Sequence, residues 1–131
     1  MAEILQPEHW PRPKGYSNGV VASGRQVFLS GTIGWDSSGR LVSQEFAAQV
    51  RQAFLNIVEL LTQAKAGPQH ITRMTWYVVS RQEYLDCARE VGSIYREIIG
   101  RHYPAMSVVE VSALVEAGAR VEIEVTAVVP A

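Results

Sequence analysis

The chain has 131 residues and a formal charge of −1, from 13 acidic and 12 basic side chains, and 47% of its residues are hydrophobic. This length fits one domain over residues 1–131, and the apolar content excludes disorder as the main state. The near-zero charge argues against a nucleic-acid or anionic-membrane surface, and the single cysteine excludes an internal disulfide.

The N-terminal quarter predicts extended structure, a hairpin and a loop. Three prolines among the first fifteen residues favour extended or irregular chain. Short apolar runs at Gly19–Ala22 and Gln26–Ser30 flank Ser23-Gly24-Arg25, a pattern typical of two strands joined by a short turn. Gly31–Leu41 is rich in glycine, serine and aspartate, and is predicted to be a loop.

The first helix is predicted over Glu45–Lys65, with Gly67 as its stop. Its apolar positions recur at steps of three and four, and they are Phe46, Val50, Phe54, Ile57, Val58 and Leu61. Polar residues such as Gln49 are expected away from that apolar face. A strand over Ile71–Val79 follows, rich in valine, threonine and aromatic residues.

The second half repeats the alternation of helix and strand. Ser80-Arg81-Gln82-Glu83 matches a capping box and predicts a helix from there to about Ile99. Ser107–Leu114 and Arg120–Val129 are the last two predicted strands. The order is therefore β-β-α-β-α-β-β, which indicates a two-layer α+β domain with two helices on one face of a mixed sheet. Such a small monomer hides its apolar surface poorly, so another subunit is expected to cover part of it.

Five motifs follow one another along almost the whole chain. They are Gly15-Tyr16-Ser17-Asn18-Gly19-Val20, Ser30-Gly31-Thr32, Gln49-Val50-Arg51-Gln52-Ala53, Pro104-Ala105-Met106-Ser107 and Val121-Glu122-Ile123-Glu124-Val125-Thr126-Ala127. Each motif alone is common, but the ordered set resembles the Rid superfamily, the YjgF/YER057c/UK114 group.

The resemblance implies a chorismate mutase-like fold and a homotrimer with clefts between its subunits. It also implies hydrolysis of reactive enamines and imines, such as 2-aminoacrylate, to a keto acid and ammonia, with no cofactor and no metal. Some members of the family are labelled ribonucleases or translation inhibitors.

Met106 is the main departure from the family pattern. The deaminating members have an arginine at this position, and its guanidinium holds the substrate carboxylate through two charge-assisted hydrogen bonds. Methionine has neither charge nor donor, so a neutral or apolar ligand part is expected beside it, unless it only fills the core. Val108 takes the place of a family cysteine, and Gly92 stands where the family often has asparagine.

The resemblance assigns the remaining site residues. Glu122 matches the glutamate that positions or activates the attacking water, a task suited to a carboxylate in a partly dry cleft. Tyr16 is expected at the cleft mouth, while Ser30, Gly31 and Val108 are expected to offer backbone N–H groups. Strand alternation leaves the other possibility open, that Glu122 simply faces solvent.

Two further questions concern the charge of the cleft and the use of the scaffold. Arg12, Lys14, Arg101 or His102 could replace the missing cation, although surface charge is the commoner role of such residues. The sequence predicts an imine or enamine deaminase of altered substrate or reduced activity. The alternative is a non-catalytic, metabolite-binding or regulatory trimer, and a ribonuclease is the least favoured possibility.

The chain has neither the basic and apolar parts of a signal peptide nor a long apolar run, so a cytoplasmic protein without membrane contact is expected.

Overall fold

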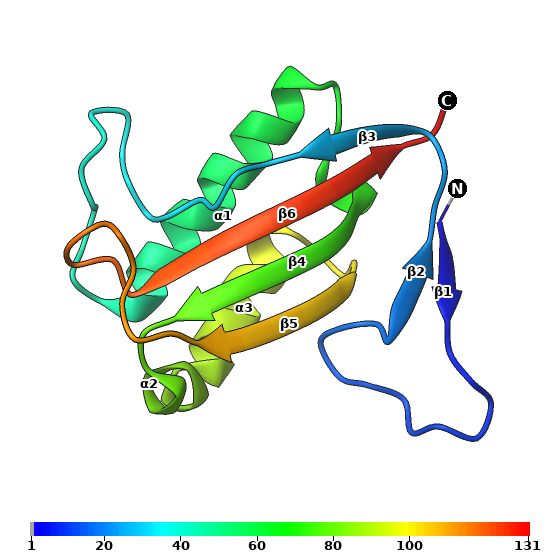
Figure 1. Ribbon diagram of the computed structural model, residues 1–131, viewed down its shortest axis with the longest axis horizontal. Helices are drawn as coiled ribbons and strands as arrows, with labels where there is room; N and C mark the ends of the chain where they lie inside the picture. The colour runs from blue at the N-terminus through cyan, green and yellow to red at the C-terminus, as the bar shows by residue number, and fades with distance from the viewer. Residues whose placement is uncertain (1) are drawn as a thin grey trace.

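A computed structural model describes residues 2–131 and consists of a mixed sheet with helices on one face (Figure 1). Four strands form this sheet in the order β3 (Arg25–Phe28), β6 (Val121–Val129), β4 (Ile71–Val78) and β5 (Ala105–Glu110). β4 and β5 are parallel, whereas β6 runs antiparallel to both β3 and β4. The predicted α+β class, with its mixed sheet, is confirmed.

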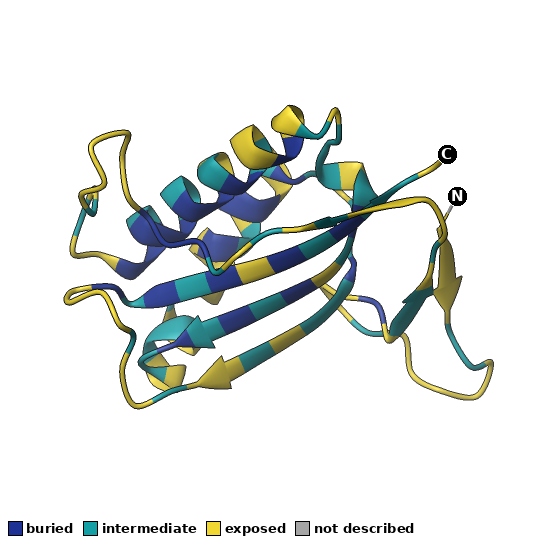
Figure 2. Ribbon diagram, turned by 45° about the horizontal axis from the view of Figure 1, so that its top comes forward, coloured by how far each residue is buried: buried dark blue, intermediate teal, exposed yellow. Residues whose placement is uncertain are grey.

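The helices are α1 (Phe46–Gln63), α2 (Arg81–Asp86) and α3 (Ala88–Ile98), with a short 3₁₀ turn at Pro68–His70. Figure 2 shows the buried residues of α1 turned toward the sheet, whereas α2 has none. The region predicted as one second helix forms two helices, α2 and α3. They meet at Cys87, whose φ of −95° and ψ of 7° interrupt the helical path. Ser80 caps α2 as predicted, because its side chain accepts a hydrogen bond from the Glu83 N–H.

The predicted N-terminal hairpin is wrong. Gly19–Val21 forms β2, but it pairs with β1 (Glu3–Leu5), and β3 pairs with β6 instead. Between β2 and β3, Gly24 has a φ of +145°, and a Cβ there would lie 2.1 Å from a backbone oxygen of Val129. The chain turns sharply at this glycine, and β3 joins the large sheet, where pairing is more stabilising than in an isolated hairpin.

The end of α1 also differs from the prediction. The residue in the left-handed conformation is Lys65, with a φ of 58°, while Gly67 has an ordinary φ of −138° and begins the 3₁₀ turn. The backbone N–H of Lys65 still bonds to a carbonyl of the last helical turn. The helix stop therefore lies two residues before the glycine that the sequence favoured.

Gln49 is fully buried, contrary to the expectation that the polar residues of α1 lie away from the core. Its Nε2 donates to the carbonyls of Ser43 and Gly118, each at 2.9 Å, and its Oε1 accepts the Arg120 N–H at 2.8 Å. The side chain thus joins the loop before α1 to the turn before β6. Burial is tolerated because every bond of this amide is made inside the protein.

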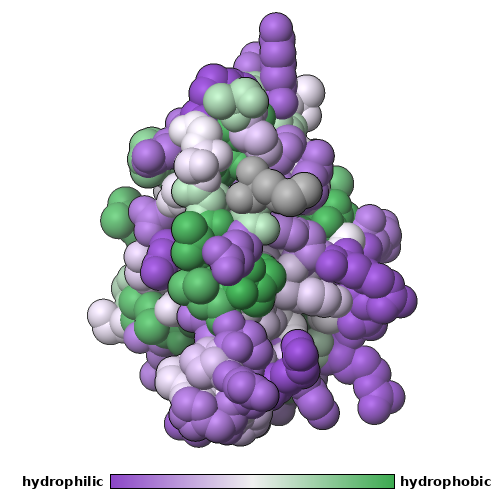
Figure 3. Space-filling model, turned by 90° about the vertical axis from the view of Figure 1, so that its right-hand side faces the viewer, coloured by the Kyte–Doolittle hydropathy of each residue, from purple (hydrophilic) through white to green (hydrophobic). Residues whose placement is uncertain are grey.

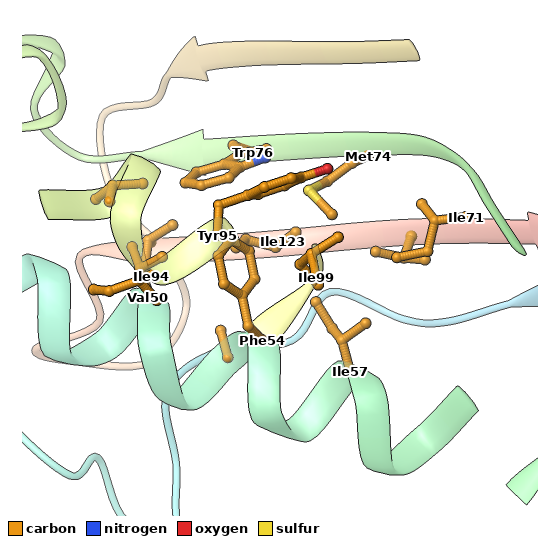
Figure 4. Close-up of a cluster of buried hydrophobic side chains, with 14 of the residues drawn as sticks. Val50, Phe54, Ile57, Ile71, Met74, Trp76, Ile94, Tyr95, Ile99 and Ile123 are labelled. Carbon is orange, nitrogen blue, oxygen red and sulfur yellow. The ribbon is translucent and has the colours of Figure 1, made fainter. Parts of the chain in front are cut away.

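The core lies between α1, α3 and the sheet. Phe54 packs edge-on against both Trp76 and Tyr95, with ring centroids 5.6 Å apart in each pair. Figure 4 shows these side chains meeting between the helices and β4. This aromatic cluster fixes α3 against the middle of the sheet, next to the cavity described below.

Candidate functional site

The residues predicted for the site fall on opposite faces of the four-stranded sheet. Strand pairing sets Met106 beside Met74, and Val108 beside Trp76, on the face that the helices cover. Glu122 pairs with Tyr77 on the other face. Because neighbouring strand residues point to opposite sides, one chain cannot bring Glu122 and Met106 into one cavity.

A cavity of about 510 Å³ opens on the helix side of the sheet, between β4, β5, α2, α3 and residues 14–16. We call it the helix-face cavity. Aromatic side chains are the largest group in its walls, and they are Tyr16, Trp76, Tyr84, Tyr95 and Tyr103. Met106 and Val108, both half-buried, also line it. Its size and its apolar lining are those of a small-molecule site.

Tyr16 stands at the cavity mouth because the next residue is anchored. Ser17 is buried, its N–H donates to the Pro104 carbonyl at 2.9 Å, and its hydroxyl donates to the carbonyl of Tyr103. Ser17 also forms a bridge with Ala105 at the start of β5. The tyrosine itself remains 42% exposed. The Tyr16 and Met106 motifs, far apart in sequence, therefore meet at one opening.

Two cations line the helix-face cavity, Lys14 and Arg96, and no carboxylate does. Lys14 was among the substitutes considered from the sequence, whereas Arg12 and Arg101 do not line the cavity. His102 is half-buried rather than turned to water, and its Nε2 lies 2.7 Å from the Ile71 carbonyl oxygen. That nitrogen must carry a proton, because a carbonyl only accepts.

Apart from these two cations, the polar side-chain groups of the cavity walls are neutral: tyrosine hydroxyls and one indole N–H. Trp76 is only 2% exposed, and its indole Nε1 has no hydrogen-bond partner among the described residues. Burial raises the pKa of both Tyr84 and Tyr95, so these phenols stay protonated at neutral pH. The Tyr95 hydroxyl is already used, since it donates to the His102 carbonyl at 2.6 Å.

The second set of predicted residues lies on the uncovered face of the sheet. The Glu122 carboxylate rests against Gly31 so closely that a Cβ there would lie 2.1 Å from Oε2. Thr32 and Ile123 exchange both backbone hydrogen bonds, at 2.8 and 2.9 Å, which holds this loop along β6. Ser30 is exposed, and its carbonyl accepts the Thr32 hydroxyl. A larger residue at position 31 would therefore displace the Glu122 side chain from this place.

Apolar and acidic side chains share the uncovered face. Phe28 is 71% exposed there and Val109 is 43% exposed, while the Tyr77 hydroxyl lies 3.3 Å from Glu124. Further apolar side chains gather at the end of the molecule that carries β1 and β2 (Figure 3), where Ile4, Leu5 and Val21 are about half exposed. Neither surface is covered by the rest of the described chain.

The sequence prediction missed several residues of the helix-face cavity, above all Arg96. The only available signal was spacing, since Arg96 follows Gly92 by four positions on α3 and both face the cavity. Trp76 was expected in the core and lies there, but it also lines the cavity. Cys87 lies outside the cavity, and burial, followed by nearby carboxylates, raises its thiol pKa, which does not suit a nucleophile.

Residues 2–131 offer neither a cluster of metal ligands nor a membrane-spanning helix. In this part of the chain, no three histidine, cysteine, aspartate or glutamate side chains cluster as metal ligands would. The helices described here are also too short or too polar to cross a membrane.

Comparison with known proteins groups the chain with one family. The family model described as endoribonuclease L-PSP matches residues 9–129. The 2-iminobutanoate/2-iminopropanoate deaminase of Homo sapiens is 32% identical over 114 residues, which are 86% of this chain and 79% of the human one. A RutC family protein of Aquifex aeolicus is 32% identical over 98% of this chain and 99% of its own. Among solved structures, the Rid-family protein YyfB of Yersinia pestis superposes with a TM-score of 0.83 at 31% identity, over 98% of each chain.

Proposed function

The chain belongs to the Rid (YjgF/YER057c/UK114) family, and from that premise we propose that it hydrolyses a reactive imine or enamine to a carbonyl product and ammonia, with no cofactor. Homologues at about 30% identity are 2-iminobutanoate/2-iminopropanoate deaminases. The observation that carries the proposal is Glu122, held against Gly31 on an open face, with no hydrogen-bond partner among the described residues.

The reaction needs one base and one water. In the proposed mechanism the Glu122 carboxylate takes a proton from water, whose oxygen bonds to the imine carbon. The nitrogen gains protons, the carbon–nitrogen bond breaks, and ammonia leaves as the carbonyl forms. One water is consumed and one ammonia released, so no oxidant or reductant enters. Backbone N–H groups at Ser30 and Gly31 are proposed to bind the developing oxygen charge.

The complete site is proposed to form between subunits of a homotrimer. Glu122 and Gly31 of one subunit would face the helix-face cavity of the next, where Tyr16, Met106 and Val108 are proposed to contact the substrate. The arrangement is supported by the split of the two sets across one sheet and by the exposed Phe28. Native mass spectrometry is expected to give three times the 14.5 kDa chain mass, and a purely monomeric species at micromolar concentration would contradict it.

Met106 is proposed to shift the substrate away from that of the arginine-bearing relatives. Its thioether cannot bind a carboxylate, so little activity is expected on 2-aminoacrylate or 2-iminopropanoate. A rate equal to that of an arginine-bearing member would overturn this. The substitution Met106→Arg is expected to raise the rate on these small substrates if the rest of the cleft is competent.

Ammonia release from a panel of enzymatically generated imines tests the activity. Glu122→Gln keeps the size of the side chain but removes the base, and about a hundredfold loss of turnover is expected. Glu124→Gln is the matched control, because it lies two residues along the same strand face. Equal rates for wild type and Glu122→Gln, or equal losses in both variants, would contradict the proposal.

A non-catalytic, metabolite-binding trimer is the second candidate, and Met106 favours it because the usual carboxylate anchor is absent. A rise of melting temperature with keto acids, without ammonia release from any imine, would support this function. A ribonuclease is the least favoured, since a net charge of −1 gives the chain no overall attraction for RNA.

A further inference from the structure

Arg96 provides a guanidinium at the mouth of the helix-face cavity. It lines the cavity from α3, and a Cβ built on Gly92 would lie 3.4 Å from its Nη1. The guanidinium therefore lies back along the helix, over the glycine one turn earlier. A branched side chain at position 92 would crowd it, so the glycine gives Arg96 room to reach the cavity.

This guanidinium has no ion-pair partner among residues 2–131. The two ion pairs found in that range join Arg51 to Glu97 and Arg120 to Glu83. Glu97, the acidic neighbour of Arg96, thus accepts hydrogen bonds from Nη1 and Nη2 of Arg51, at 2.8 and 2.9 Å. Arg96 and Lys14 make the cavity mouth positive in a chain of net charge −1. A local positive field at an apolar cavity attracts an anion.

A second group in the cavity also lacks a partner. The Trp76 Nε1–H is buried and unpaired, whereas nearly all buried donors in proteins are hydrogen-bonded. Figure 4 shows its indole reaching from β4 over the side chains of α1 and α3. Trp76 lines the cavity, but this nitrogen has almost no surface open to it, so the indole ring serves as part of the apolar wall.

The rest of the lining is apolar and the space is large. Tyr84, Met106 and Val108 offer rings, a thioether and methyl groups. At about 510 Å³ the cavity exceeds the needs of a three- or four-carbon acid. Where the family arginine would occupy part of this space, the shorter and uncharged Met106 leaves room for the apolar body of a ligand.

We propose that the helix-face cavity binds imino and keto acids with branched or aromatic side chains, and that Arg96 anchors their carboxylate in place of the arginine that Met106 replaces. This rests on the proposed function for the reaction, but the anchor itself is a binding property that can be measured without turnover. Arg96 would then decide which substrates are accepted.

Titration calorimetry on the assembled protein tests the anchor. The probes are 4-methyl-2-oxopentanoate and its uncharged methyl ester. The acid is expected to bind more tightly than the ester. Arg96→Gln is expected to weaken binding of the acid about tenfold or more and to leave binding of the ester unchanged. Arg89→Gln, on the exposed side of the same helix, is the matched control and is expected to change neither. Inorganic phosphate, which lacks an apolar body, is not expected to compete.

Two further variants test the geometry. Gly92→Asn fills the space beside the guanidinium. It is expected to weaken binding of the acid severalfold without affecting binding of the ester. Trp76→Phe makes this part of the cavity wall smaller but keeps an aromatic ring, and it is expected to weaken binding of the acid and of the ester alike. Thermal melting of each variant separates a loss of binding from a loss of folding.

The outcomes separate this inference from the proposed reaction. Binding that depends on Arg96, with no ammonia release from any imine, would leave the anchor standing and overturn the deaminase. Turnover that depends on Glu122, with KM and Kd unchanged in Arg96→Gln, would leave the deaminase standing and overturn the anchor. No binding of the acid by wild type, or equal loss in Arg96→Gln and Arg89→Gln, would also overturn the anchor.

Discussion

The two faces of the four-stranded sheet differ in how far one chain completes them. On the face under the helices, Ile123 is fully buried and Trp76 is 2% exposed. On the other face the same strands present Glu122 and Tyr77, and Phe28 lies largely open to solvent. The strand backbone is common to both faces, so the difference comes only from the alternation of side chains.

This difference separates folding from function. The covered face supplies the apolar burial that holds α1 and α3 in place, and it also keeps the helix-face cavity. The uncovered face adds little to the stability of an isolated chain, yet it carries the carboxylate that the family resemblance assigns to catalysis. Substitutions on the two faces should therefore have different consequences, and paired variants can test that.

The largest effect is expected from Phe54→Ala on the covered face. Phe54 is fully buried and touches two other rings edge-on, so truncation should cost about 3–5 kcal/mol of unfolding free energy. Phe28→Ala, at an open position, should change the stability of the isolated chain by less than about 0.5 kcal/mol. Denaturant unfolding at low protein concentration measures both.

Measurements at several protein concentrations distinguish Phe54→Ala and Phe28→Ala further. If Phe28 packs against another subunit, the effect of Phe28→Ala grows with concentration, because association stabilises only the wild type. The effect of Phe54→Ala on stability is not expected to grow with protein concentration. Similar losses for both variants in the dilute monomer would show that the two faces are not as different as the burial indicates.

The next largest effect concerns Gln49, the polar group inside the covered face. Gln49→Leu keeps the volume but leaves two carbonyls and one N–H without partners, which should cost about 2–3 kcal/mol or more. Gln52→Leu is the control on the same helix, where only a bond to Asn56 is lost, worth about 0.5 kcal/mol. Equal melting temperatures for the two variants would contradict a structural role for Gln49.

Local pattern predicted most of the fold, and the exceptions have physical reasons. The periodicity of α1 and the cap at Ser80 depend on neighbours in sequence, and both agree with the structure. The pairing of β3 with β6 joins residues about a hundred positions apart, and no local signal distinguishes it from a hairpin. Gln49 was misplaced for the same reason, since its partners come from distant loops.

The candidate site was less predictable than the fold. Motif order identified Tyr16, Met106 and Glu122, but it could not show that a sheet separates the last two. Arg96 belongs to no motif, and it lies in the helix-face cavity over Gly92, one turn earlier on α3. Cavity residues of this kind depend on three-dimensional packing, which a single sequence does not encode in short spacings.

A smaller effect should appear at alkaline pH, and it again distinguishes the faces. Burial raises the pKa of Tyr95 above its usual value of 10.0, so the fold holds a proton that the unfolded chain releases above pH 10. The corresponding stability is present below pH 10 and is lost as pH rises, by about 1.4 kcal/mol per pH unit. Tyr95→Phe should reduce this slope by one proton, although it also loses the bond to His102. Urea unfolding at several pH values measures the slope, and an unchanged slope would contradict the assignment.

The smallest effect is expected at Tyr77 on the uncovered face. The Glu124 carboxylate, 3.3 Å from the hydroxyl, raises the pKa of this phenol, with burial and Glu122 as further causes. Glu124→Gln should therefore lower the pKa of Tyr77, and Glu122→Gln should lower it less, because its carboxylate is a weaker influence. Phenolate absorbance during an alkaline titration follows this change, with Tyr77→Phe identifying the signal. A larger shift in Glu122→Gln than in Glu124→Gln would mean that Glu122 lies closer to Tyr77 in solution, and so farther from Gly31, than this arrangement allows.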